Sequence, residues 1–141
     1  MIQIVSSLMP LYIDIIPDRV EPGVLYVSRR FATAIHLCAC GCGKEVVTPL
    51  SKGEWKIQGS AKIVSLYPSI GNWEYPCQSH YWIKQNKIVW AGKIPRRYIE
   101  ASRARDNANI ERLYCSDQRN NEYLFYKFVK LLKELFKKVK G

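Results

Sequence analysis

The sequence predicts an α+β protein in which a strand-rich body, residues 1–95, is followed by one or two helices in residues 96–141. Up to residue 95, short β-branched and aromatic runs alternate with Gly, Pro, Asn and Ser turn signals, a pattern typical of sheets. Beyond it, residues 96–113 lack glycine and proline and carry the alanine and arginine that favour helix. The length of 141 residues and the apolar share of 48% fit one domain, residues 1–141.

The expected strands follow from apolar runs bounded by turn residues. Residues 81–90 are expected to form a hairpin with its turn near Gln85 and Asn86, although no Asn-Gly pair marks that turn. In chain order, the expected strands are residues 11–16, 24–27, 33–37, 46–48, 55–57, 62–66, 80–84 and 87–90.

Two stretches of the last third have helical patterns. A helix is expected over about residues 97–107 or a longer stretch, and a final helix is expected to begin at Asn120 or Asn121, either of which is a candidate N-cap. Apolar residues of the final helix recur at spacings of three and four, at Leu124, Phe128, Leu131, Leu132, Leu135 and Val139. Its polar face carries Lys127, Lys130, Lys133, Lys137, Lys138 and Lys140.

The positive charge of the chain is concentrated near its C-terminus. The net charge is +10, and residues 96–141 account for +6 of it, with 12 Lys and Arg against 6 Asp and Glu. Such an excess attracts polyanions, which are nucleic acid, an anionic membrane surface or an acidic partner protein. The alternative is a solvated basic face that aids solubility.

The chemical role expected of the cysteines depends on whether the protein is in a reducing or an oxidising compartment. No uncharged apolar run approaches the roughly 18 to 20 residues of a membrane span, and the first ten residues lack a signal-peptide pattern, so a cytoplasmic location is expected. In a reducing compartment, clustered cysteines indicate metal ligands before they indicate disulfides.

Three of the five cysteines, Cys38, Cys40 and Cys42, form one chelating piece. Residues i and i+2 of an extended strand lie about 6.6 Å apart, so these thiols share an ion only if the chain folds back between them. Gly41 and Gly43 tolerate positive φ and permit that turn.

A second chelating piece consists of Cys77 and His80, which lie three residues apart and can converge through one turn. The two pieces together predict one tetrahedral zinc ion. Five candidates exceed the four positions, and the spacing does not decide which is left out. The alternative is buried structural thiols with a hydrogen-bonded core histidine.

Two further residues are weaker candidates. His36 shares a strand face with Cys38 and could be another candidate ligand or a hydrogen-bond partner of one. The alternative is a partly buried polar side chain without a role at the metal. Cys115 stands alone in the sequence and is expected to be a buried thiol.

Enzyme signals are sparse. Glu45 and Glu74 are the acids nearest the two chelating pieces, but no motif positions either against a metal-bound water, so a closed, non-catalytic site is expected. Ser79 beside His80 suggests a serine nucleophile, yet adjacent residues of an extended chain point apart. The zinc deaminase and His-Glu-x-x-His signatures are absent.

Four motifs stand out within residues 20–92, namely His36 to Gly43, Pro68 to Gly71, Cys77 to Ile83, and Val89-Trp90. Together they resemble the motifs of a small bacterial family of uncharacterised zinc-binding proteins. Members of that family are often encoded beside genes for E1-like, E2-like and ubiquitin-like proteins. The resemblance implies a metal-binding role for Cys38, Cys40, Cys42, Cys77 and His80.

Three functions are compatible with these observations. The first is a zinc-binding interaction module, such as an accessory or ligase-like adaptor in a bacterial ubiquitin-like pathway, with Trp73 and Tyr75 as contact aromatics or as ordinary core residues. The second is a nucleic-acid binder that uses the basic segment. The third is a zinc-dependent peptidase that acts on ubiquitin-like conjugates.

Overall fold

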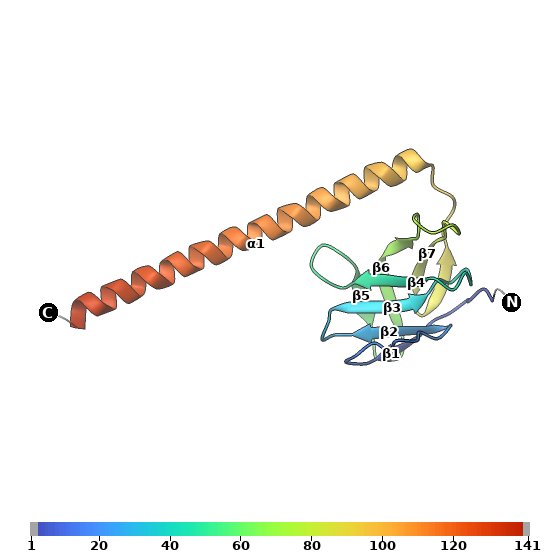
Figure 1. Cartoon of the computed structure of the whole chain (residues 1–141), viewed down its shortest axis with the longest axis horizontal. Helices are drawn as coiled ribbons and strands as arrows, with labels where there is room; N and C mark the ends of the chain where they lie inside the picture. The colour runs from blue at the N-terminus through green and yellow to red at the C-terminus, as the bar shows by residue number, and fades with distance from the viewer. Residues whose placement is uncertain (1–2, 140–141) are drawn as a thin grey trace. The chain divides into compact units, whose positions relative to one another are not determined.

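The chain forms two compact units, residues 1–96 and 97–141, which are described separately. The structure is a computed structural model that describes the backbone of residues 3–139 and the side chains of residues 3–131. The first unit contains eight strands within these residues, and the second is one helix (Figure 1). The predicted α+β class, a strand-rich body followed by helix, is confirmed.

The first sheet has the strand order β1-β2-β3-β4. Its strands are β1 (Met9–Tyr12), β2 (Val24–Ser28), β3 (Thr33–Leu37) and β4 (Glu45–Pro49). Strand β1 pairs parallel with β2, and the other neighbours are antiparallel. Strands β3 and β4 pair along their whole length, from Thr33 opposite Pro49 to Leu37 opposite Glu45, so the β3–β4 loop begins at Cys38.

The second sheet has the order β5-β6-β7-β8 and is wholly antiparallel. Its strands are β5 (Lys56–Gly59), β6 (Val64–Gly71), β7 (His80–Lys84) and β8 (Lys87–Trp90). The predicted hairpin is confirmed, because Lys84 pairs with Lys87 and both turn residues have positive φ, 48° at Gln85 and 68° at Asn86. That conformation is the one that a two-residue hairpin turn requires.

A single apolar cluster joins the two sheets. It contains Leu25, Val27, Ala34 and Val46 from the first sheet, and Val64, Leu66, Ile70, Tyr81 and Ile83 from the second. Cys38 and Ala39, at the start of the β3–β4 loop, belong to it as well. The cysteine loop is therefore anchored on the core.

The N-terminal segment connects both sheets before the first strand begins. Val5 donates its amide hydrogen to the Ala39 carbonyl at 2.9 Å, and Leu8 donates to the Asn86 carbonyl at 2.7 Å. The Ile88 amide in turn donates to the Ser6 carbonyl at 2.8 Å, and Leu8 is only 1% exposed. The chain then enters the first sheet as β1.

Strand β6 runs further than the sequence predicts. Residues 62–66 were expected, but the strand continues through Pro68 and Ser69 to Gly71. The pairing with β7 shifts between Leu66, opposite Ile83, and Ile70, opposite Tyr81. Proline is tolerated at such a bulge because no ladder hydrogen bond is required of it there.

The helix of the second unit, α1 (Arg96–Val139), contains 44 residues. The two predicted helical stretches are therefore parts of one helix, which also includes residues 108–119. No glycine or proline interrupts that stretch, and its Asn, Asp and Ser residues lower helix propensity only slightly. Cys115 was expected to be buried, and this prediction is wrong because Cys115 is exposed on α1. None of the helical residues that the structure describes forms a segment long and apolar enough to cross a lipid bilayer.

Candidate metal centre and candidate active site

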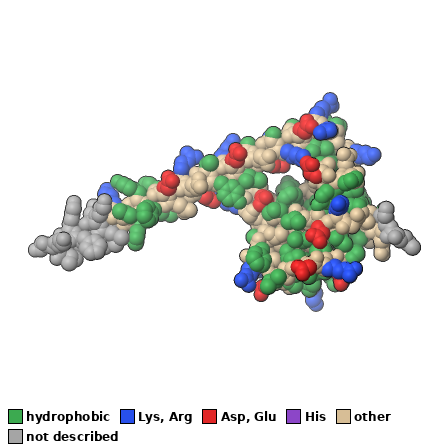
Figure 2. Space-filling model, viewed as in Figure 1, with side chains coloured by type: hydrophobic (Ala, Val, Ile, Leu, Met, Phe, Trp, Pro, Cys, Tyr) green, Lys and Arg blue, Asp and Glu red, His purple; other side chains and the backbone are tan. Residues whose placement is uncertain are grey.

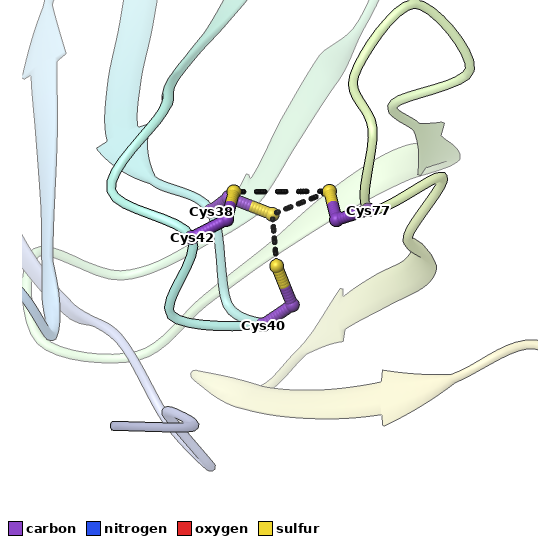
Figure 3. Close-up of side chains that lie close together, drawn as sticks. All are labelled: Cys38, Cys40, Cys42 and Cys77. Atoms are coloured by element: carbon purple, nitrogen blue, oxygen red, sulfur yellow. Dashed lines mark hydrogen bonds between the residues drawn. The ribbon is translucent and has the colours of Figure 1, made fainter. Parts of the chain in front are cut away.

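Four of the five predicted ligand residues have their ligand atoms in one cluster. The sulfur atoms of Cys38, Cys40, Cys42 and Cys77 all lie within 4.8 Å of one another (Figure 3). Cys38 Sγ is 3.4 Å from Cys40 Sγ and 4.0 Å from Cys77 Sγ, and Cys42 Sγ is 3.7 Å from Cys77 Sγ. A tetrahedral zinc ion with bonds of about 2.3 Å to sulfur places its ligands about 3.8 Å apart. The four cysteines therefore fit a zinc ion.

The β3–β4 loop folds back as the chelation argument requires. The Gly41 amide donates to the Cys38 carbonyl at 3.0 Å, and the Cys38 amide donates to the Lys44 carbonyl at 2.8 Å. Both glycines have positive φ, 83° at Gly41 and 76° at Gly43, and glycine adopts this conformation without a steric penalty. The resulting turn brings three thiols to one side of the loop.

Cys77 arrives on the loop between β6 and β7. This loop is closed at its base, because the Asn72 amide donates to the Ser79 carbonyl at 2.9 Å. The Gln78 amide donates to the Tyr75 carbonyl at 2.9 Å and forms the turn that carries Cys77. The cysteines thus join a loop of the first sheet to a loop of the second.

Polar side chains surround Cys38 on its buried side. Ser79 Oγ lies 3.0 Å from Cys38 Sγ, and the Asn72 amide group donates to Ser79 Oγ at 2.8 Å and to Cys38 Sγ at 3.5 Å. Hydrogen bonds of this kind orient metal-binding thiolates and reduce their negative charge density. Ser79 therefore faces the cysteines.

The thiols influence one another's ionisation. Burial, followed by the hydrogen bond with Cys38, raises the pKa of the Cys40 thiol, and burial also raises the pKa of Cys42. Burial opposes ionisation of Cys77 too, but hydrogen bonds from the backbone and side chain of Ser79 lower its pKa to about 7. Four thiolates that lie close together repel one another unless a cation is present. A metal ion bound by the four sulfurs would therefore stabilise their thiolate form.

His36 is linked to the cysteine loop through the hydroxyl group of Tyr81. Its Nε2 lies 2.8 Å from the Tyr81 hydroxyl, which also accepts a hydrogen bond from the Ala39 amide at 3.4 Å. The ring is fully buried, and burial lowers the pKa of His36 to about 3. His36 is therefore a neutral core residue, and the described metal cluster does not include it.

His80, the fifth predicted ligand, also lies outside the group of four cysteines. Its Nε2 is 3.0 Å from Ser69 Oγ on the neighbouring strand β6. On β6, Ser69 and Gly71 alternate with Ile70, which is buried in the core, and on β7, His80 and Trp82 alternate with the buried Tyr81. The Ser69–His80 pair therefore lies on the face of the second sheet that points away from the core.

Two tryptophan rings contact the His80 imidazole. The ring centroids are 4.9 Å apart for Trp73 and His80 and 5.6 Å apart for Trp82 and His80. The indole ring of Trp73 packs directly on Gly71, where a Cβ atom would collide with the ring. His80 Nδ1 is buried and has no hydrogen-bond partner among the described residues. Two aromatic contacts and the Ser69 hydroxyl thus hold this imidazole.

Trp73 and Tyr75, the suggested contact aromatics, are both half-buried. Trp73 packs on His80, and Tyr75 packs against the core and donates its hydroxyl hydrogen to the Glu45 carbonyl. Glu45 and Glu74 are exposed, and neither belongs to the described cysteine cluster. Ser69 had no predicted role, although Pro68 to Gly71 belongs to the motifs that carry the family resemblance.

Comparison with known proteins identifies one family. The model of the family described as bacterial ubiquitination-like system serine protease (BubE) matches residues 12–91, which contain all four clustered cysteines, Ser69 and His80. Neither the curated proteins nor the solved structures include a match to this chain.

Proposed function

This chain belongs to the BubE family of bacterial ubiquitination-like system serine proteases, and we propose that Ser69 is its nucleophile and His80 its general base. The expected connection with a bacterial ubiquitin-like pathway is confirmed by the family. The 3.0 Å distance between Ser69 Oγ and His80 Nε2 carries the assignment, because a serine nucleophile needs a base within hydrogen-bond reach. The chain's other histidine, His36, is buried against Tyr81.

The proposed reaction is acyl transfer in two steps. Ser69 Oγ attacks the substrate carbonyl while His80 Nε2 takes its proton, and His80 then gives that proton to the leaving amine or alcohol as the bond to the carbonyl breaks. Water attacks the acyl-serine next, His80 takes the proton of the water, and Ser69 Oγ leaves with that proton. The product is a free carboxylate.

His80 must hold its proton on Nδ1 if Nε2 is to accept one from Ser69. A carboxylate usually fixes that tautomer and stabilises the imidazolium ion, but here the neighbours are the rings of Trp73 and Trp82. The face of an indole attracts a cation by about 0.5 to 2 kcal/mol. We assign both rings the role of positioning the imidazole and stabilising its charged form.

The four cysteines support this site structurally. They would hold a zinc ion in a closed site, whose chemistry when bound is to fix the two loops that supply its ligands. The loop of Cys77 leaves β6 directly after Gly71 and enters β7 at His80, so its ends adjoin both members of the pair. By holding a metal, the four cysteines would fix the loop whose ends adjoin Ser69 and His80, and so the separation of that pair.

The proposed substrates are proteins that carry a ubiquitin-like modifier, with the scissile carbonyl at the end of the modifier. The support is the family's membership of a ubiquitination-like system. A peptidase was the third function expected from the sequence, and it was expected to be a zinc enzyme. Because the cysteines can fill all four zinc positions while Ser69 meets His80 elsewhere, we propose serine chemistry in place of zinc chemistry.

A fluorophosphonate probe is expected to label the intact protein at Ser69, because such probes phosphonylate a serine only when a base activates it. Mass spectrometry of the digested protein would locate the adduct. Ser65→Ala is the matched control, since Ser65 lies on the same strand as Ser69 but accepts a hydrogen bond from the Gln85 amide, and it should retain labelling. Labelling that persists in Ser69→Ala would refute the assignment.

Trp73→Ala is expected to slow this labelling about tenfold, whereas Trp73→Phe should lose less, because phenylalanine keeps an aromatic face against His80. The measurement is the second-order rate constant of labelling, with the thermal midpoint as a check on folding. Equal labelling rates for Trp73→Ala and the unaltered protein would remove Trp73 from the site.

A further inference from the structure

The C-terminal part of α1 separates apolar from basic residues around the helix. At 100° per residue, Leu124, Phe125, Phe128 and Leu131 fall within an arc of about 120°. Lys127 and Lys130 fall outside this arc. The sequence continues the same spacing to residue 140, with apolar positions at Leu132, Leu135 and Val139 and basic ones at Lys133, Lys137, Lys138 and Lys140. We call residues 124–140 the basic amphipathic segment.

The described apolar side chains of this segment are open to solvent. Leu124 is 61% exposed, Phe125 69%, Phe128 57% and Leu131 59%. Figure 2 shows such apolar side chains gathered on the described part of the helix near its C-terminal end. Large exposed apolar surfaces of this kind are typical of interaction sites.

The charges of the segment decide which partner fits. Residues 124–140 contain the six lysines named above and a single acid, Glu134. A basic polar face opposite a broad aromatic and aliphatic face is the pattern of helices that lie in the interface of an anionic bilayer. Lysine stems can extend along the apolar surface and place their ammonium groups among lipid phosphates. Tyr123 and Tyr126, which are also exposed, are residues that favour the membrane–water boundary.

The alternatives match less of this pattern. Nucleic acid would engage the lysines but leave the apolar arc in water. A coiled coil with a second copy of the helix would bury only the a and d positions of each heptad. Leu124, Phe128 and Leu131 fit these positions, but Phe125 lies beside them and would stay exposed. Pairing of two copies would also bring two sets of lysines together with only Glu134 in each to offset them.

We propose that the basic amphipathic segment binds the surface of an anionic lipid bilayer, with its apolar arc in the interface and its lysines on lipid phosphates. The lysines of its polar face place the segment along the surface of the bilayer. This proposal does not depend on the protease assignment.

Flotation of the full-length protein with vesicles tests the proposal. The protein should float with vesicles of phosphatidylcholine and phosphatidylglycerol at least about tenfold more efficiently than with phosphatidylcholine alone, because each lysine near an anionic surface adds to binding. Phe128→Gln with Leu131→Gln should reduce flotation at least about tenfold without changing the charge. Lys127→Glu with Lys130→Glu should remove the preference for anionic vesicles.

The matched control is Arg105→Glu with Arg112→Glu, which makes the same charge change at exposed positions of α1 outside the segment. It should float like the unaltered protein. Equal loss in this control would show a general charge effect and overturn the proposal. Absence of flotation would overturn it too, whether the protein is then a dimer that covers the face or a nucleic-acid binder. The thermal midpoint of each variant reports whether it is folded.

Discussion

Ser69→Ala is expected to reduce cleavage of a ubiquitin-like conjugate by a factor on the order of 10⁴ or more, because it removes the proposed nucleophile. His80→Ala should cost about as much, and the double variant should cost little more, since the two residues act as one unit. The measurement is the rate of release of the modifier, with each variant's thermal midpoint recorded alongside.

Ser65→Ala provides the matched control on the same strand. Ser65 accepts a hydrogen bond from the Gln85 amide at the far end of β6, so its loss should leave cleavage within about twofold. Full activity of Ser69→Ala, or losses for Ser69→Ala and His80→Ala that multiply in the double variant, would exclude the pair as the catalytic unit.

The purified protein is expected to carry one zinc ion per chain, and Cys77→Ser should unfold the strand-rich body. Binding of a structural zinc ion contributes apparent folding free energy on the order of 10 kcal/mol, which is comparable to the whole stability of a domain. Elemental analysis measures the metal, and circular dichroism measures the fold before and after removal of the ion by a chelator.

Three kinds of variant separate the ligands from the residues around them. Cys115→Ser changes an exposed thiol on α1 and should retain both metal and stability. His80→Ala should retain the ion if the four cysteines hold it, and loss of zinc there would restore His80 to the ligand set. Glu45→Gln and Glu74→Gln should leave metal content and cleavage unchanged, as expected for a closed site. A metal-free preparation of full stability would contradict the zinc assignment.

Many strands and turns of the strand-rich body were predictable because each is determined by a few neighbouring residues in the sequence. Strands β3, β7 and β8 have the bounds that the apolar runs predict, and the turn at Gln85 and Asn86 follows from two residues. The turn of the β3–β4 loop at Gly41 and Gly43 was predictable for the same reason. Its chelating geometry requires the chain to reverse within a few residues, and only positive φ allows that.

The proposed catalytic pair was not predictable, since it depends on strand register. The Pro68 that precedes Ser69 is a turn signal in a sequence, and only the shifted pairing of β6 with β7 makes that stretch a strand. His80 is three residues from Cys77, which is a chelating spacing. The turn of that loop nevertheless directs Cys77 to the cysteines, while His80, already in β7, faces Ser69.

The N-terminal segment has a consequence for anyone who trims this protein. A fragment cut to the matched residues 12–91 would lose nearly all of β1, the Leu8 side chain and the hydrogen bonds to Ala39 and Asn86. Strand β2 would then present unpaired amides and carbonyls along an open edge, where other chains can add. The smallest fragment that keeps β1 and both of these hydrogen bonds therefore begins before Val5.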